Sequence, residues 1–267
     1  MSKLFAWFTG LLALAAAGGI AAAGPGTRFG YWDYTTGLKL IRDISSPQSF
    51  AGLSISPLIA AAGLALVAAV LAFVTRHPRS AAFAFFSAVI AGAALTVPVQ
   101  MKRAVELNPF IHDVTTDFDD PPQIVAAASL PRKNPTEYRG NDPLPRDESG
   151  KTVAEAQREA FLLIKPMYVR SDLDGAKDVA LKVINSMGMD ILAQGDAPGG
   201  GYAIEAVAIS RFFGFKDDFI VRLRPGKHDE ETRVDIRSQS RVGLSDLGAN
   251  AKRVRIFMEK FRAEFPE

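Results

Sequence analysis

The stretch "RVDIRSQSRVGLSDLGANAKR", residues 233–253, decides the kind of domain with which the chain ends. Its first part alternates apolar and polar residues, so that Val234 and Ile236 share one side, as in a β-strand with one buried face. Its last part opens a pattern in which apolar residues recur every three or four positions, as on one side of a helix. The stretch therefore predicts a strand over residues 232–240, a glycine-containing corner, and a helix over residues 245–264.

The corner between this strand and this helix has three interpretations. It could bind an anion or a partner, because the free N–H groups at the start of a helix favour negative charge. It could instead be structural, with Ser245 or Asp246 capping the helix. A catalytic role is the weakest of the three. The candidate residues for binding an anion or a partner are Arg237, Ser238, Ser240, Arg241, Ser245 and Arg253.

We favour the structural interpretation of the corner. It predicts that Arg237 or Arg241 is buried in an ion pair with Asp235, Asp246 or Glu205, because a buried charge needs a partner. If the corner binds an anion instead, the two arginines should matter for binding and not for stability.

Residues 151–267 have the pattern of one α+β domain. Alternating apolar residues separated by Gly- and Pro-containing turns predict four strands, which a meander would join into an antiparallel sheet. Helices flank this sheet. We expect its charged face to be a solvated surface with ion pairs between neighbouring strands. The predicted strands are 189–194, 202–210, 218–224 and 232–240, and the predicted helices are 152–163, 174–187 and 245–264.

The first 103 residues predict a membrane module with three transmembrane helices. Three uncharged apolar runs, over residues 4–23, 53–74 and 81–101, are each about the 20 residues needed to cross a hydrocarbon core. They are rich in Ala and Gly, which lets helices approach closely in lipid. The first run could also be a signal peptide. Between the first two runs, residues 30–44 predict a short amphipathic segment at the membrane interface or a loop with anchoring aromatics.

The distribution of charge separates the two halves of the chain. Of the 31 Lys and Arg and 29 Asp and Glu residues, eight basic and two acidic ones lie in residues 1–103, which leaves 23 basic against 27 acidic for residues 104–267. An acidic soluble part argues against nucleic acid as a partner. Three crossings from an inside N-terminus would put the C-terminal domain outside. The basic residues flanking the spans leave this orientation open.

Residues 104–150 contain seven prolines and predict an extended arm between the membrane module and the α+β domain. Within it, "IHDVTTDFDDPP", residues 111–122, gathers carboxylates as hard-cation loops do. Its spacing lacks the alternating aspartates and the glycine of such loops. We therefore expect a turn-rich segment whose Asp and Thr side chains bond to the local backbone, and no metal site.

The sequence favours a binding protein over an enzyme and predicts no catalytic residue and no cofactor. It contains no cysteine, which excludes thiolate chemistry. It has neither a Gly-x-Ser-x-Gly elbow nor a Gly-rich phosphate loop ending in Lys-Ser/Thr. The three histidines, His77, His112 and His228, lie in a link, the arm and a turn, and none belongs to a candidate triad.

Several long motifs resemble the bacterial domain-of-unknown-function family 1499. They are "FGFKDD", "VDIRSQSRVGLSDLGANAKR", "IHDVTTDFDDPP" and "LIKPM", and "GYWDYTTGLKLIRD" is similar to the membrane-anchored type. The resemblance implies a cell-envelope protein in the bacterial inner membrane, with its C-terminal domain on the periplasmic side. It implies no activity, and so no catalytic residue. The segment "AFLLIKPM" departs from the pattern, because an aromatic-Pro pair is expected before the Lys-Pro.

Two kinds of function are therefore expected. In the first, the α+β domain binds a partner or an envelope component, such as an envelope protein or a glycan. The membrane module of the same chain contacts membrane lipids. In the alternative, the domain handles a lipid or small molecule in a pocket between the sheet and the C-terminal helix. Phe212, Phe213 and Phe215 are the candidate lining of that pocket, and a filled core would favour the first kind.

Overall fold

The structure is a computed structural model that describes residues 2–50 and 53–265. The chain forms two compact units. Unit 1 comprises residues 1–103 and 211–214, and unit 2 comprises residues 104–210 and 215–267. Residues 104–150, for which the sequence predicts an extended arm, therefore lie in unit 2 together with the α+β domain.

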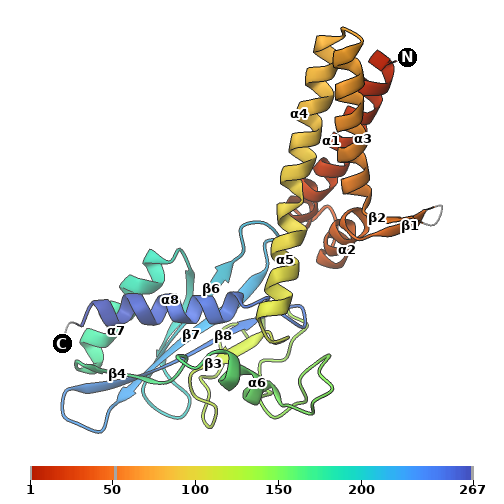
Figure 1. The fold of residues 1–267 in the computed structure, drawn as a ribbon. Coiled ribbons are helices and arrows are strands. Elements are labelled where there is room, and N and C mark those ends of the chain that lie inside the picture. Colours follow the sequence, from red (N-terminus) through yellow and green to blue (C-terminus); the bar gives the residue numbers. More distant parts are fainter. Residues whose placement is uncertain (1, 51–52, 266–267) are drawn as a thin grey trace. The chain divides into compact units, whose positions relative to one another are not determined.

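Unit 1 is built on three helices that run side by side, α1, α3 and α4 (Figure 1). Three helical stretches are long and apolar enough to cross a membrane: Ser2–Arg28, Pro57–Val74 and Pro78–Leu107. The elements are α1 (Ser2–Arg28), α2 (Tyr34–Ser45), β1 (Gln48–Phe50), β2 (Leu53–Ile55), α3 (Pro57–Val74) and α4 (Pro78–Ala94), followed by α5 (Thr96–Leu107), which runs past the end of unit 1.

Small side chains let these helices approach one another closely, as in other bundles of apolar helices. The ring of Phe83 occupies the space that a Cβ atom on Gly10 would need, 2.5 Å away, and it stacks on Trp7 at 4.2 Å. The hydroxyls of Ser2 and Thr75 lie 2.8 Å apart, so the start of α1 lies beside the α3–α4 turn. A buried alanine cluster joins the helices: Ala6, Ala68, Ala69, Ala72, Ala81 and Ala84.

The second predicted span begins later than expected, because residues 53–55 form a strand that pairs with β1. Ser56 caps α3 by accepting a hydrogen bond from the backbone N–H of Ile59, and Pro57 occupies the first helical turn, where its missing N–H does no harm. The amphipathic segment predicted within residues 30–44 contains a helix, α2, which the side chain of Asp33 caps.

Unit 2 contains a six-stranded antiparallel sheet, and the prediction of four strands was wrong. The order is β3-β8-β7-β6-β5, and β4 also pairs with β8. The elements are β3 (Asp113–Thr115), α6 (Val153–Ala160), β4 (Met167–Arg170), α7 (Leu173–Ser186), β5 (Asp190–Asp196), β6 (Tyr202–Ile209), β7 (Lys216–Pro225), β8 (Glu231–Ser240) and α8 (Ala249–Ala263).

The two additional strands are short and share the outer edge of β8. Val114 of β3 pairs with Ser238, and Tyr168 of β4 pairs with Arg233. Three- and four-residue strands flanked by Asp, Pro and Lys carry almost no alternation of their own. Pairing with β8, more than 60 residues away in the chain, determines their conformation.

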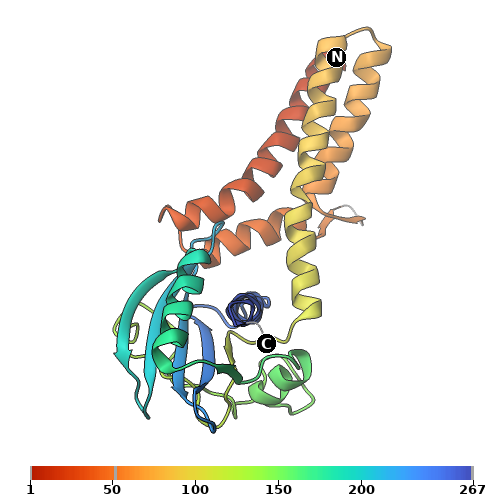
Figure 2. The same cartoon turned by 90° about the vertical axis from the view of Figure 1, so that its left-hand side faces the viewer.

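Helices α7 and α8 cover one face of this sheet (Figures 1 and 2). The rings of Phe219, Phe257 and Phe261 are fully buried there, with Phe219 and Phe257 at a centroid distance of 5.3 Å and Phe257 and Phe261 at 5.5 Å. The space between the sheet and α8 is therefore occupied by core side chains. The alternative of a pocket in this position finds no support in the packing.

The second face of the sheet is covered by residues 116–140, which we call the strap. Arg222, Asp235 and Arg237 on this face are at most 2% exposed, so the expectation of a solvated charged face was wrong. The alternation of apolar and polar residues shows which side chains point away from the apolar core, and on a bare sheet these side chains would be exposed to water. It cannot show that a distant part of the chain covers the opposite face.

Candidate functional site

The six candidate residues of the corner do not form one site. Those in β8 and directly after it alternate between the two faces of the sheet, whereas Ser245 precedes α8 and Arg253 belongs to it. Ser238 and Ser240 share the face of Val234 and Ile236, toward α8, and both are buried. Arg237 and Arg241 have the opposite parity and bond to groups beneath and within the strap. Each half has its own geometry.

On the helix face, Asn250 joins Ser238, Ser240 and Arg253 into one polar cluster. The Ser238 hydroxyl donates to Asn250 Oδ1 at 2.7 Å, and Asn250 Nδ2 donates to Ser240 Oγ at 3.0 Å. Arg253 donates to Ser238 Oγ at 2.9 Å and to the carboxylate of Asp217 at 2.7 Å. Ser238 and Arg253 already donate to acceptors of the protein, and Ser240 accepts from Asn250, so the cluster serves to fix α8 on β8.

The start of α8 is capped by Asp246 and not by Ser245. Helix α8 begins at Ala249, after Gly248 in the left-handed conformation (φ 84°), which favours glycine. The Asp246 carboxylate accepts hydrogen bonds from the N–H groups of Gly248 at 2.8 Å and Asn250 at 2.7 Å. Ser245 Oγ only accepts a 3.3 Å bond from the N–H of Leu247. A carboxylate of the protein therefore occupies the end of α8 at which an anion would be expected.

Burial raises the pKa of Asp246 from 3.8 to about 6, although its two backbone hydrogen bonds act in the opposite direction. The pKa of Asp246 is higher in the folded than in the unfolded protein. The contribution of Asp246 to stability is therefore fully present below about pH 4 and is lost as the pH rises through 6. We expect Asp246→Asn to remove this loss, so that the stability of the variant falls less between pH 4 and 7 than that of the wild type. Melting temperatures across this range measure it. Asp172→Asn, at the exposed cap of α7, is the matched control, and parallel curves for Asp246→Asn and wild type would contradict the prediction.

Beneath the strap, Arg222, Arg224 and Arg233 interact with three aspartates. Arg224 lies 2.7 Å from the carboxylates of both Asp120 and Asp235, and Arg233 Nη2 donates to Asp117 at 2.5 Å. Three positive charges thus meet three negative ones, Asp117, Asp120 and Asp235. This cluster is balanced, and two of its aspartates come from the strap.

A second buried cluster under the strap contains both predicted arginines. Arg237 donates two hydrogen bonds to Asp113, at 3.0 and 2.7 Å. Arg241 donates twice to Asp218, at 2.8 and 2.7 Å, and Arg132 binds the same carboxylate at 2.9 Å. The prediction of a buried arginine is confirmed, but its proposed partners were wrong. They are Asp113 and Asp218.

Glu205 lies on the same face and has partners of a different kind. Its carboxylate accepts three backbone hydrogen bonds, from Val125 and Ala126 at 2.9 Å and from Ala127 at 3.2 Å. Such a ring of N–H groups stabilises a carboxylate as a cation would. It also fixes the middle of the strap to strand β6.

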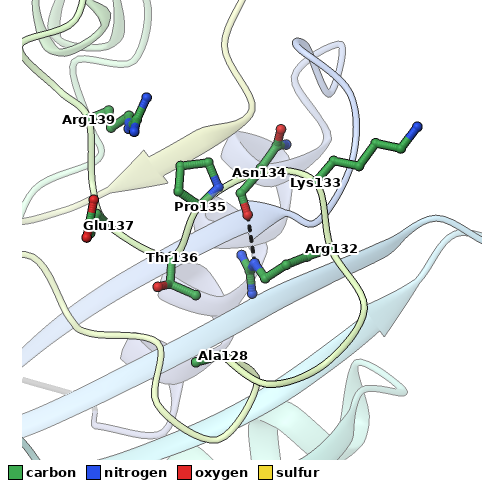
Figure 3. A pocket seen from close by; sticks show the side chains of 8 residues that line it. All are labelled: Ala128, Arg132, Lys133, Asn134, Pro135, Thr136, Glu137 and Arg139. Atoms are coloured by element: carbon green, nitrogen blue, oxygen red, sulfur yellow. Dashed lines mark hydrogen bonds between the residues drawn. The ribbon is translucent and has the colours of Figure 1, made fainter.

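The strap forms a pocket of about 610 Å³ over the second cluster (Figure 3). Its wall is held from below by the predicted corner. Arg237 donates to the carbonyl of Thr136 at 2.8 Å, and the carbonyl of Arg241 accepts from the N–H groups of Lys133 at 2.8 Å and Asn134 at 3.0 Å. The lining residues are Ala128, Arg132, Lys133, Asn134, Pro135, Thr136, Glu137 and Arg139.

None of these lining residues was among the sequence candidates. A signal was present in "PRKNPTEYR", residues 131–139, where two basic residues stand between two prolines and a third follows. The prolines were interpreted as marks of an arm, although they are equally suited to an ordered loop with a fixed path.

The phenylalanines predicted to line a pocket lie elsewhere. Phe212 and Phe213 belong to unit 1, and their rings meet edge-on at 5.2 Å. Phe215 precedes β7, and its N–H donates to Ser210 Oγ at 2.9 Å. Among the described residues, the core cluster between the sheet and α8 includes none of the three.

The acidic segment before and within the strap uses its side chains locally, as expected for a turn-rich segment, and also in the ion pairs with distant arginines described above. Asp117 Oδ1 accepts from the N–H groups of Asp119 at 3.2 Å and Asp120 at 3.1 Å. Burial lowers the pKa of His112, which favours its neutral form. Over residues 2–50 and 53–265, no group of three or more His, Cys, Asp or Glu residues could hold a metal ion.

One comparison with known proteins gives a match. A family model described as "Protein of unknown function (DUF1499)" matches residues 113–261. The match starts at β3 and includes the whole strap, the sheet and most of α8, so the strap is part of the matched domain. No curated protein and no solved structure matches the chain.

Proposed function

The chain belongs to the DUF1499 family, and we propose that it is an envelope protein anchored in the bacterial inner membrane, whose unit 2 binds an envelope component. The pocket in the strap is the observation that supports binding. It is a concave surface with three basic residues, and its wall is held by hydrogen bonds from two buried side chains of β8, Arg237 and Gln239. Small-molecule sites are commonly preformed in this way.

The composition of unit 1 supports an anchor over a transporter. Within the three candidate spans, Asp, Glu, Lys and Arg occur only near the ends, as Lys3, Arg28, Arg79, Lys102, Arg103 and Glu106. Transport pathways and proton relays place such residues inside the membrane. The residues buried within the three helices of this bundle are alanines, glycines, Ile20, Leu58 and a few hydroxyl residues, of which Thr9 and Ser87 bond to their own helix.

We further propose that unit 2 lies on the periplasmic side. The resemblance to envelope proteins supports this orientation. The basic residues that flank the spans do not, because only three of them lie at the end of the helix bundle that contains Ser2 and Thr75, which this orientation places inside, and five lie at the opposite end. A C-terminal reporter that is active only outside the cytoplasm should give a signal, and one that is active only inside should not. The reverse result would place unit 2 in the cytoplasm.

Native mass spectrometry of the full chain, extracted from cell membranes in mild detergent, tests the binding function. We expect a bound component of defined mass. Thr136→Trp, which adds bulk at the pocket without changing its charge, should remove it. Ser129→Trp, at an exposed strap position outside the pocket lining, should not. Wild-type protein without any bound component, or one that persists in Thr136→Trp, would contradict the proposal.

A further inference from the structure

The chemistry of the ligand can be inferred from the charges beneath the pocket, on the premise that the proposed binding function holds. The second buried cluster holds three guanidinium groups, Arg132, Arg237 and Arg241, against two carboxylates, Asp113 and Asp218. Asp218 is 1% exposed and is shared by two of the arginines. Buried charges are normally paired, because leaving one without compensation costs several kcal/mol.

The pocket lies on the side of this cluster at which Arg132 reaches the surface. Arg132 is fixed by hydrogen bonds to Asp218 at 2.9 Å and to the carbonyl of Asn134 at 2.8 Å, and it also bonds to Gln239. The strap residues around it add Lys133 and Arg139 against Glu137. The Arg139 side chain also meets Asp142 at 3.7 Å, in an exposed pair that solvent screens. Glu205 adds a further buried carboxylate on this face, bound by the N–H of Ala127. The excess of positive charge therefore belongs to the pocket lining, where three basic residues stand against Glu137 alone.

Figure 3 shows how the basic side chains of the pocket differ in direction. The guanidinium of Arg132 lies in the middle of the lining residues, near Thr136. Lys133 extends away from them, and Arg139 stands at the far side, beyond Glu137. Arg132 thus provides a fixed charge, and Arg139 is positioned to approach a ligand from the rim.

We propose that this pocket binds a phosphate group. Phosphate matches the excess of positive charge, and its several oxygens can accept hydrogen bonds from Arg139, from Arg132 and from the Thr136 hydroxyl at the same time. The phosphate could belong to a soluble phosphate ester or to a phospholipid headgroup. Arg237 and Gln239 act as positioning residues, because they donate to the carbonyls of Thr136 at 2.8 Å and Pro135 at 2.9 Å.

The test uses the full chain in nanodiscs of phosphatidylcholine, titrated with inorganic phosphate and followed by isothermal titration calorimetry. We expect saturable binding that weakens as NaCl is added. Arg139→Ala should weaken it about tenfold. Arg170→Ala, which removes the same charge from the exposed end of β4, should change it less than twofold. Arg139 is more than half exposed, so its loss should leave the melting temperature unchanged.

A second arm separates the two sources of the phosphate. If a lipid headgroup occupies the pocket, nanodiscs containing phosphatidylglycerol should compete with inorganic phosphate, and Arg139→Ala should remove the competition. If a soluble ester is the ligand, phosphatidylglycerol should have no effect. Absence of saturable binding, or equal losses in Arg139→Ala and Arg170→Ala, overturns the inference. If the phosphate inference fails in this way, the proposed binding function can still hold. A bound component that is lost in Thr136→Trp and contains no phosphorus would support binding and exclude phosphate.

Discussion

Replacing Arg237 with alanine should lower the free energy of unfolding of unit 2 by about 3–5 kcal/mol, because it leaves the carboxylate of Asp113 buried without its partner. Asp113 is 5% exposed and receives two hydrogen bonds from Arg237. The change also removes donors to the carbonyls of Pro122 and Thr136 in the strap. For a unit of this size, such a loss lowers the melting temperature by on the order of 10 °C, which thermal unfolding in detergent would measure.

Two further variants show whether the ion pair itself is responsible. Arg170→Ala, at an exposed position, should change stability by less than about 0.5 kcal/mol. The double variant Arg237→Met with Asp113→Leu should recover part of the loss, because it removes both buried charges. If Arg237→Ala melts within about 1 °C of the wild type, the pair contributes little, and Arg237 becomes a candidate for direct ligand binding.

The sequence predicted a buried arginine in the corner because the structural interpretation assigns these arginines to the fold, and a buried charge needs a partner. It could not predict the partners. Asp113 is 124 positions away from Arg237, and the pair forms only because β3 lies beside β8. The proposed partners Asp235 and Glu205 are on the correct face, but other groups bind them: arginines on β7 and β8, and backbone N–H groups of the strap. Asp246 is at the other face and caps α8.

The separation of the candidate site into two halves could have been predicted. Side chains alternate along a strand with a period of two, so Ser238 and Ser240 cannot share a face with Arg237 and Arg241. Grouping them by nearness in sequence ignored this rule. The position of the pocket was not predictable in the same way, because it depends on where a loop without regular structure is held by buried arginines.

The features that follow from local pattern were predicted well. Apolar runs predicted the candidate spans, and alternating apolar residues predicted β5, β6, β7 and β8. The features that depend on contacts distant in sequence were missed. The strap is the main example, since its fixed path comes from the side chains of β6, β7 and β8 and not from any propensity of residues 116–140.

This dependence leads to a prediction about which fragment folds. The sequence alone suggests that residues 151–267 are independent of what precedes them. The structure indicates that this fragment would lack β3 and the strap, and with them the apolar side chains of Ile111 and Val114, which belong to the main core. Residues 104–267, which keep all of these groups, should instead form a soluble, folded protein.

The expected effect on the shorter fragment is comparable with the stability of a typical domain. Without the strap and β3, Arg237 loses Asp113, the cluster of Arg222, Arg224 and Arg233 loses two of its three aspartates, and Glu205 loses three N–H donors. Each broken buried pair costs about 3–5 kcal/mol, whereas a whole domain is stable by about 5–15 kcal/mol. Two such losses add up to about 6–10 kcal/mol, which is as large as the stability of many domains.

Expression of the two fragments side by side measures this difference. Residues 104–267 should give a cooperative thermal transition and dispersed amide signals in NMR spectra, whereas residues 151–267 should aggregate or remain unfolded. Residues 141–267, which add back only part of the missing chain and none of the strap's aspartates, are the control for length and should behave like the shorter fragment. A cooperative transition for residues 151–267 would mean that the charged face of the sheet tolerates water, and that the strap is a cover which the domain can lose without unfolding.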